Sequence, residues 1–425
     1  MASPQVFELK CAVQQYAWGK IGKDSEVAKL KSSVDPDFVV DPDAPYAELW
    51  MGTHPNGPSI VSIPGKEDVP LSQWLEQHPE QLGPEVRSYF KGSLPFLFKV
   101  LSVRTSLSIQ AHPNKVHAEL LHKKHPDLYK DPNHKPEMAI ALTPFTGLCG
   151  FRPIKDVAHY LQTVDEFREA VGEKACKLLT ASHSMDMPLH REAMKDAFMA
   201  LMQRDDKVIS HALKSLVEKV KDLKKSSANE YKQYEGDILL KLDSEFPGDR
   251  GCFAIYFLNI VNLEPGEAMF LEANLPHAYL SGDCMECMAC SDNVVRAGLT
   301  PKYIDVHTLC EMLDYTGRPV SRTKFLGIES HSNIHITIFN PPVPDFGVSK
   351  FEVPEGTSSF QLQGFESASI CIIIKGEGEA NGEPQSQPIT LKPGTVFFVA
   401  AEANVNIGIK KGHAMLLFRA YSGVF

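Results

Sequence analysis

Four side chains able to bind a metal ion stand in three separate parts of the chain. Gln110 and His112 lie two residues apart, just after an apolar run, residues 96–103, that predicts a strand. On an extended backbone both would project from one face. Glu137 and His277 come from two later polar segments. Two nitrogen and two oxygen donors suit Zn²⁺ or a similar divalent ion, with room for a substrate oxygen. The sequence therefore predicts one metal centre.

Each of these residues also has an ordinary structural interpretation. The alternating Gln110 and His112 are typical of the polar outer face of a strand, and His277, which follows a proline, is typical of a turn. Taken together, three polar clusters in otherwise apolar surroundings favour a metal centre over these ordinary structural interpretations.

Basic side chains stand beside the same segments. Lys99 lies in the predicted strand, Lys135 lies two residues before Glu137, and Arg296 lies in an otherwise uncharged stretch after the last donor. In a protein with a net charge of −10, such a group is suited to hold an anion. The alternative for Arg296 is a structural ion pair, and the sequence leaves both open.

A second possible metal motif is incomplete. Cys284, Cys287 and Cys290 have the spacing of an iron–sulfur run, but the fourth position is Val294. We therefore interpret these cysteines as free thiols.

Length, composition and charge limit the protein class. A chain of 425 residues, 43% hydrophobic and 23% charged, is expected to form two or three globular domains. The net charge of −10 argues against general binding to nucleic acid or to an anionic membrane. The first residues resemble no secretory signal, and no apolar run is long enough to span a bilayer. Nine scattered cysteines fit reduced thiols, so we expect a cytoplasmic protein.

The elements that must position these residues fall into three blocks. Short apolar runs and many Pro and Gly residues predict strands up to about residue 151, with one helix near residues 71–82. Residues 152–250 contain apolar stripes at helical spacing, for example over residues 208–223, and predict a helical insertion. Strands resume afterwards, and the run 253–258 predicts a buried one.

A short internal repeat suggests two copies of one β unit. Leu, Pro, Gly, Phe and Ala recur at identical offsets in residues 263–273 and 391–401. The place of His277 in the first copy is occupied by Val405 in the second, so we expect the second copy to be metal-free and to serve as a structural part or a lid. Short strands, Pro-Gly turns and a metal inside a small barrel indicate a pair of cupin-type jelly rolls.

The predicted fold class is therefore mainly β, with two cupin-type double-sheet barrels and an α-helical insertion. The expected domains are residues 1–151 with 251–310 for the catalytic barrel, 152–250 for the helical insertion and 311–425 for the degenerate C-terminal barrel.

Several long phrases of the chain are distinctive: Tyr16–Gly19, Tyr46–His54, Ser108–Asn114, His134–Glu137, Pro276–Leu280 and Asp292–Pro301. Over essentially the whole chain, the sequence resembles one known family, the type I phosphomannose isomerases, and the animal enzymes most closely. The resemblance implies a cytosolic, monomeric enzyme with one Zn²⁺ per chain. It would interconvert mannose 6-phosphate and fructose 6-phosphate and feed GDP-mannose synthesis and glycosylation.

The resemblance also implies roles for individual residues. The family's zinc ligands fall on Gln110, His112, Glu137 and His277, and its active-site arginine falls on Arg296. The surroundings of its active site fall on Lys99, Ser108, Lys135, Tyr279 and Glu286.

Isomerisation through a cis-enediolate requires a carbon base with a pKa near neutrality. Glu286 and Lys135 are both candidates, and the sequence does not choose between them. His134 is expected to assist ring opening, and Ser108, Lys99 or both are expected to meet the phosphate. A cupin oxygenase with Fe²⁺ and a sugar-phosphate sensor without catalysis are the alternative functions.

Overall fold

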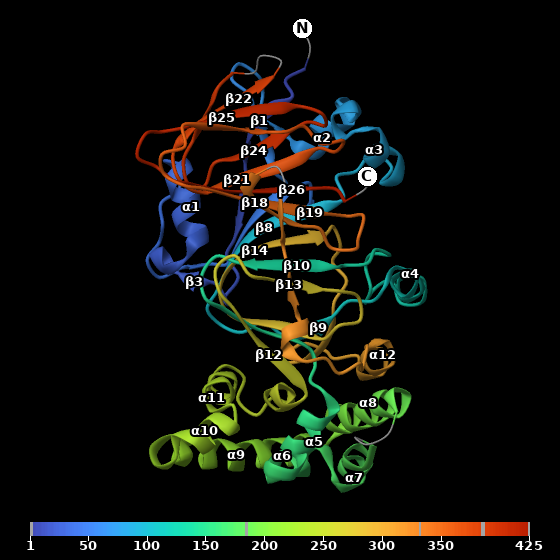
Figure 1. Cartoon of the computed structure of the whole chain (residues 1–425). Helices are drawn as coiled ribbons and strands as arrows, with labels where there is room; N and C mark the ends of the chain where they lie inside the picture. Colours follow the sequence, from blue (N-terminus) through green and yellow to red (C-terminus); the bar gives the residue numbers. More distant parts are fainter. Residues whose placement is uncertain (1–2, 183–185, 331–332, 384–386, 424–425) are drawn as a thin grey trace.

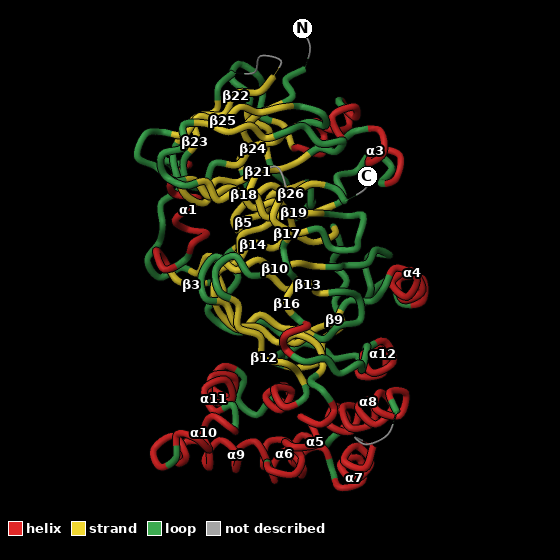
Figure 2. The backbone as a smooth tube through the Cα atoms, viewed as in Figure 1, coloured by secondary structure: helices red, strands yellow, loops and turns green. Residues whose placement is uncertain are grey.

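A computed structural model describes residues 3–182, 186–330, 333–383 and 387–423. Figure 1 shows three regions along the molecule: C-terminal strands towards the top of the view, the strands of the metal-site segments in the middle and a helical block at the bottom. Figure 2 shows that strands dominate the first two regions and helices the third.

The middle region is a branched sheet of eleven strands. Its main path runs through β16 (Lys324–Phe325), β13 (Ala268–Leu271), β10 (Glu137–Ala141), β14 (His277–Ala289), β8 (Phe96–Val103), β5 (Glu48–Gly52) and β2 (Ala12–Gln14). Four strands lie off this path: β9 (Ile109–Ala111), β11 (Phe145–Phe151), β12 (Leu258–Leu263) and β15 (Val295–Gly298). The long strand β14 pairs with β8, β9, β10 and β11, so it joins every strand that carries a predicted site residue except β15.

The upper region combines both ends of the chain. The nine-stranded sheet runs β17 (Ile328–Ser330), β18 (Asn333–Phe339), β19 (Gly347–Val353), β26 (Met415–Tyr421), β21 (Ser369–Lys375), β24 (Val396–Val399), β1 (Val6–Lys10), β6 (Ile60–Ser62) and β7 (Val69–Pro70). A four-stranded sheet contains β20 (Ser359–Leu362), β25 (Asn404–Ile409), β22 (Gly378–Glu383) and β23 (Ile389–Leu391). A short pair joins β3 (Lys20–Ile21) and β4 (Pro45–Tyr46). Because β1 pairs with β24, the expected N-terminal and C-terminal domains share one sheet.

The helical block lies between β11 and β12 in the sequence. It consists of α5 (Ile154–Thr163), α6 (Asp165–Val171), α7 (Glu173–Ser182), α8 (Met187–Gln203), α9 (Asp206–Ser226), α10 (Ala228–Gln233) and α11 (Gly236–Glu245). The apolar stripe of α9 is buried and Asp205 caps its first turn, which agrees with the helix predicted from the spacing.

In the described part of the chain, five further α-helices lie outside this block. They are α1 (Glu26–Val34), α2 (Leu71–Gln77), α3 (Pro84–Tyr89), α4 (Lys115–Lys124) and α12 (Val306–Met312). The helix predicted near residues 71–82 is thus α2, followed by a 3-10 turn over Pro79–Leu82.

One predicted strand is wrong. Residues 250–256 form a 3-10 helix, η3 (Arg250–Tyr256), and the strand β12 begins only at Leu258. Every residue from Gly251 to Tyr256 is buried. A fully buried apolar run has no polar face, so its period cannot distinguish a strand from a helix.

The two repeat segments have the same local structure. Leu263 ends β12 and Leu391 ends β23, and in each case a Pro-Gly turn leads into the next strand. Gly266 and Gly394 have φ angles of +89° and +93°, in the left-handed region that favours glycine.

Within the described residues, none of the helices combines the length and the apolar character needed to cross a membrane.

Candidate functional site

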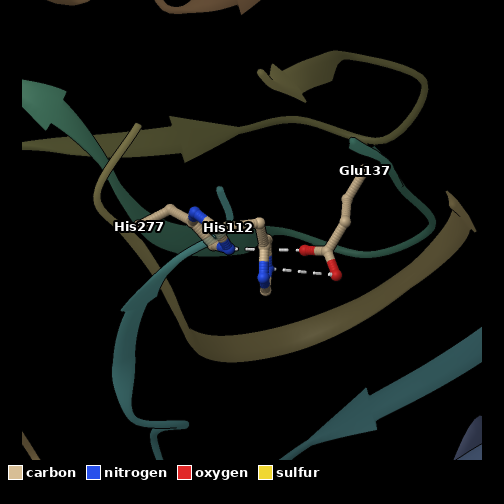
Figure 3. Close-up of side chains that lie close together, drawn as sticks. All are labelled: His112, Glu137 and His277. Carbon is tan, nitrogen blue, oxygen red and sulfur yellow. Dashed lines mark ion pairs between the residues drawn. The ribbon is translucent and has the colours of Figure 1, made fainter. Parts of the chain in front are cut away.

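Three of the predicted metal donors meet inside the middle sheet. His112, Glu137 and His277 are all buried, and their donor atoms lie within 4.8 Å of one another. Nε2 of His112 lies 3.5 Å from Oε1 of Glu137, and Nε2 of His277 lies 3.3 Å from Oε2 (Figure 3). Glu137 opens β10, His277 opens β14, and His112 follows β9 by one residue. Segments as far apart in the sequence as His112 and His277 therefore converge on one point.

Both imidazoles are oriented for a cation. Nδ1 of His112 lies 2.6 Å from the carbonyl oxygen of Asn293, and Nδ1 of His277 lies 2.8 Å from that of Leu275. A carbonyl only accepts, so each Nδ1 must carry the proton and each Nε2 presents a lone pair. Neither buried Nε2 has a hydrogen-bond partner among the described residues. Two such orphaned acceptors beside a carboxylate fit a divalent metal, which would satisfy all three groups.

Electrostatics agree with this arrangement. Burial lowers the pKa of His112 to about 4, which keeps its imidazole neutral at pH 7. Burial alone would raise the pKa of Glu137, but His112 and Lys135 outweigh it and hold the pKa well below its usual range. His112 and Glu137 thus have the protonation states that metal binding requires.

Gln110 lies beside the same point. It is the cross-strand partner of His277 in β14 and of Arg296 in β15. Residues directly opposite each other in a sheet project from the same face. The register therefore places Gln110 and Arg296 on the side of the sheet that carries His277.

Arg296 forms no ion pair with any carboxylate of the described residues, while burial lowers the pKa of its half-buried guanidinium. The sequence left two roles open for Arg296, binding of an anionic ligand and a structural ion pair. The absence of a carboxylate partner within the described residues favours binding of an anionic ligand.

A buried charge network lies next to the metal donors. Lys99 is placed between two carboxylates, with Nζ 3.0 Å from Glu286 and 3.3 Å from Glu48. The hydroxyl of Tyr279 donates to the other oxygen of Glu286 at 2.8 Å, and the indole of Trp50 donates to Glu48. Burial, together with the negative charges of Glu137 and Glu48, raises the pKa of Glu286 against the opposing effect of Lys99. The Lys99 cation is therefore already partly neutralised by protein groups.

An irregularity in β14 makes this network possible. The pairing of β14 with β11 skips Leu280, since Thr146 pairs with Ser281 and Gly147 with Tyr279. A bulge of one residue reverses which face later residues occupy. As a result Tyr279 and Glu286, seven residues apart, contact each other on the inner face.

Lys135, Ser108 and His134 lie close in the sequence to the metal donors. Nζ of Lys135 lies 3.4 Å from Glu137, and Ser108 directly precedes β9. His134 instead contacts Asp345, a residue of the C-terminal region.

Sequence reasoning missed Glu48, Asn293 and Asp345. The position of Glu48 two residues before Trp50 gave no signal, because its partner Lys99 lies on a different strand. The other two act on His112 and His134 from remote segments. Only the tertiary structure brings these pairs together.

Three family models match the chain. Their descriptions are type I phosphomannose isomerase, catalytic domain, over residues 6–154, helical insertion domain over residues 170–258, and C-terminal over residues 337–380.

Curated relatives match over nearly the full length. The chain is 50% identical to the mannose-6-phosphate isomerase of Macaca fascicularis and 49% identical to that of Homo sapiens, each over 420 residues and 99% of both chains.

Solved structures agree. A mutant phosphomannose isomerase from Salmonella typhimurium superposes with a TM-score of 0.83 at 32% identity, covering 99% of this chain and 100% of that chain. A zinc-bound mannose 6-phosphate isomerase gives a TM-score of 0.81 at 33% identity with the same coverage.

Proposed function

The chain belongs to the type I phosphomannose isomerases, and from this we propose that it is a zinc-dependent aldose–ketose isomerase that interconverts D-mannose 6-phosphate and D-fructose 6-phosphate. The observation that carries the proposal is the pair of buried, oriented histidines with free Nε2 atoms beside Glu137.

We assign the metal to Gln110, His112, Glu137 and His277, with one Zn²⁺ per chain. When bound, Zn²⁺ would supply Lewis-acid polarisation of the substrate oxygens. The support for this assignment is the donor set itself, with two imidazoles that turn Nε2 towards the Glu137 carboxylate and the amide of Gln110 on the same side of the sheet.

The reaction moves a proton between C1 and C2 through a cis-enediolate, so negative charge develops on oxygen. Arg296 has no competing carboxylate among the described residues, and its half-buried cation would stabilise this charge in a site shielded from water. We therefore assign charge stabilisation to Arg296.

The carbon base is one of two residues. Glu286 has a raised pKa, which brings its carboxylate closer to the range that a general base needs at pH 7. Lys135 stands against Glu137 at the metal donors, within reach of a ligand there. Both are kept as catalytic candidates.

Four residues are assigned to the substrate pocket. Lys99 and Tyr279 hold Glu286 through their observed contacts and would line the pocket with it. Ser108 adjoins β9 and is assigned to the phosphate, together with Lys99. His134 is assigned to the sugar, where it would assist ring opening.

Exchange of the C2 proton of mannose 6-phosphate with solvent deuterium tests the proposal, because this exchange accompanies enediolate formation. We expect exchange and conversion to fructose 6-phosphate in the zinc-loaded protein, loss of both after chelation, and recovery on addition of Zn²⁺. Full activity in a verified metal-free preparation would exclude the metal role. Binding without any exchange would identify a sensor in place of an enzyme.

For the whole protein we propose two cupin-type barrels, the second without metal. The boundaries expected from the sequence are 1–151 with 251–310, 152–250 and 311–425, and β1, β6 and β7 of the first range complete the sheet of the C-terminal strands. The repeated strand–turn–strand segments before β13 and β24 support this architecture. We further propose a cytoplasmic monomer that supplies mannose 6-phosphate for GDP-mannose synthesis and glycosylation, without nucleic-acid or membrane partners.

A further inference from the structure

Asp345 belongs to the C-terminal part of the chain but contacts the segment that leads into the metal site. It lies between β18 and β19 and is only 2% exposed. Its Oδ2 lies 2.9 Å from Nε2 of His134, a residue 211 positions earlier. His134 stands next to Lys135 and three residues before the metal donor Glu137.

The chemistry of this contact fixes the state of the imidazole. An ionised carboxylate only accepts hydrogen bonds, so Nε2 of His134 must carry the proton that it donates to Asp345. In the neutral ring, Nδ1 is then the acceptor and the only nitrogen left for another group. A carboxylate in this position also sets the orientation of the ring, as in other carboxylate–histidine pairs.

The loop that carries Asp345 is firmly placed. The carbonyl of Pro344 accepts hydrogen bonds from the amide of Gly423 and from the hydroxyl of Ser422, each at 3.0 Å. On the other side, the Phe346 ring is fully buried in the core that both sheets share. Residues that follow the last strand, β26, therefore brace the loop against the sheet.

We propose that Asp345 is a positioning residue for His134, through which the C-terminal region contributes to the substrate pocket. The inference rests on the proposed isomerase function, in which His134 contacts the sugar. Asp345 holds the proton of His134 on Nε2 and orients Nδ1 towards the substrate. Replacement of Asp345 therefore lowers kcat only in a protein that still contains His134.

A double-mutant cycle between the two residues tests this role in the zinc-loaded, full-length protein. The variants are Asp345→Ala, Asp345→Asn, His134→Ala and the double alanine variant, compared by kcat and KM for mannose 6-phosphate. Asp345→Asn keeps an oxygen that can accept from Nε2, whereas Asp345→Ala removes it. Asp345→Ser, which is too short to reach the ring, replaces the alanine variant if the latter does not fold. Glu377→Ala, which breaks an exposed ion pair with Lys410 elsewhere in the C-terminal region, is the matched control.

We expect Asp345→Ala to lower kcat by about tenfold to a hundredfold with little change in KM, since a hydrogen bond to a charged partner is lost. Asp345→Asn should retain kcat within about threefold, because the acceptor remains. In the His134→Ala background, removal of Asp345 should have no further effect, and Glu377→Ala should match the wild type.

Two results would overturn the inference while leaving the enzyme assignment intact. One is an active wild type whose Asp345→Ala variant turns over equally fast. The other is an equal loss of kcat with and without His134, which would indicate a general structural role. A wild type without any isomerase activity would overturn the inference together with the proposed function.

Discussion

Several side chains of the candidate site have no hydrogen-bond or ion-pair partner within the described residues. The buried Nε2 atoms of His112 and His277 have no partner among the described residues, and Arg296 has no carboxylate there. Leaving such groups unsatisfied is costly unless a ligand completes them. At the residue scale, these groups support the proposed binding of a cation and an anion that arrive from outside the chain.

Replacement of Arg296 tests the anionic half of this site. Arg296→Ala should fold normally and lose about 10²–10⁴ in turnover, as expected when a group that stabilises transition-state charge is removed. Steady-state kinetics and the unfolding midpoint would be measured together. Arg191→Ala, at an ion pair on the surface of the helical block, should keep full turnover. Wild-type turnover of Arg296→Ala would show that this arginine is not catalytic.

The pH dependence of kcat/KM distinguishes the two candidate bases. A carboxylate base works only when deprotonated, so activity should fall as the pH drops through the pKa of Glu286, which lies above the usual range. If Glu286 is the base, Glu286→Gln should abolish turnover, while Lys135→Ala should keep the acid limb unchanged. The candidate whose replacement preserves both turnover and the profile is excluded.

Donor chemistry predicted that His112, Glu137 and His277 meet, but it could not predict what orients them. Gln110, His112, Glu137 and His277 are recognisable because amide, imidazole and carboxylate groups are unusual in apolar segments. The partners that fix their orientation include the backbone carbonyl of Asn293, and every residue has such a group. No residue type signals that role in advance.

At the scale of elements, two turns with the same sequence pattern have different surroundings. A β-carbon on Gly394 would lie 2.0 Å from the backbone oxygen of Leu30, whereas one on Gly266 would first meet the flexible end of Lys350 at 3.0 Å. The second turn is thus pressed against α1 and the first is not.

This difference predicts unequal effects of the same substitution. Gly266→Ala should cost about 1–2 kcal/mol of stability, for the left-handed backbone alone. Gly394→Ala should cost at least about 1 kcal/mol more, since the backbone of α1 must also move. Denaturant unfolding of the two variants measures the difference. Equal losses would show that α1 accommodates the added methyl group freely.

The periodicity of apolar residues and their secondary-structure propensities predicted most helices and strands, including the helices of the insertion and the strand before the metal donors. They failed at residues 253–258, where burial on all sides removes the polar face that carries the signal. They also gave no warning of the bulge at Leu280, because the pairing with β11 determines it.

At the scale of the whole molecule, Asp249 connects the end of the helical insertion, through hydrogen bonds, to the strand that carries Arg296. Its carboxylate accepts from the backbone amides of Gly251 at 2.6 Å, Leu299 at 2.9 Å and Thr300 at 3.1 Å. Leu299 and Thr300 directly follow β15.

Asp249→Ala should therefore destabilise the protein by about 3 kcal/mol, because three amides lose a charged acceptor. It should also lower turnover, since the end of β15 is released. The neighbouring Asp206→Ala, whose exposed carboxylate pairs with Arg250, should cost less than about 1 kcal/mol. Thermal unfolding with parallel activity assays measures both effects, and similar losses for the two variants would contradict the connecting role of Asp249.

The skipped residue in β14 makes the number of residues between His277 and Glu286 a requirement in its own right. Inserting one residue between Ser281 and Met285 would preserve every donor, acid and base, so an inventory of side chains would judge the variant complete. With β8 and β10 in their present places, the added residue would shift the strand by one position and turn the sulfur-bearing Met285 and Cys287 inward and the carboxyl group of Glu286 outward. The number of residues along this strand therefore matters for the site as much as their identity does.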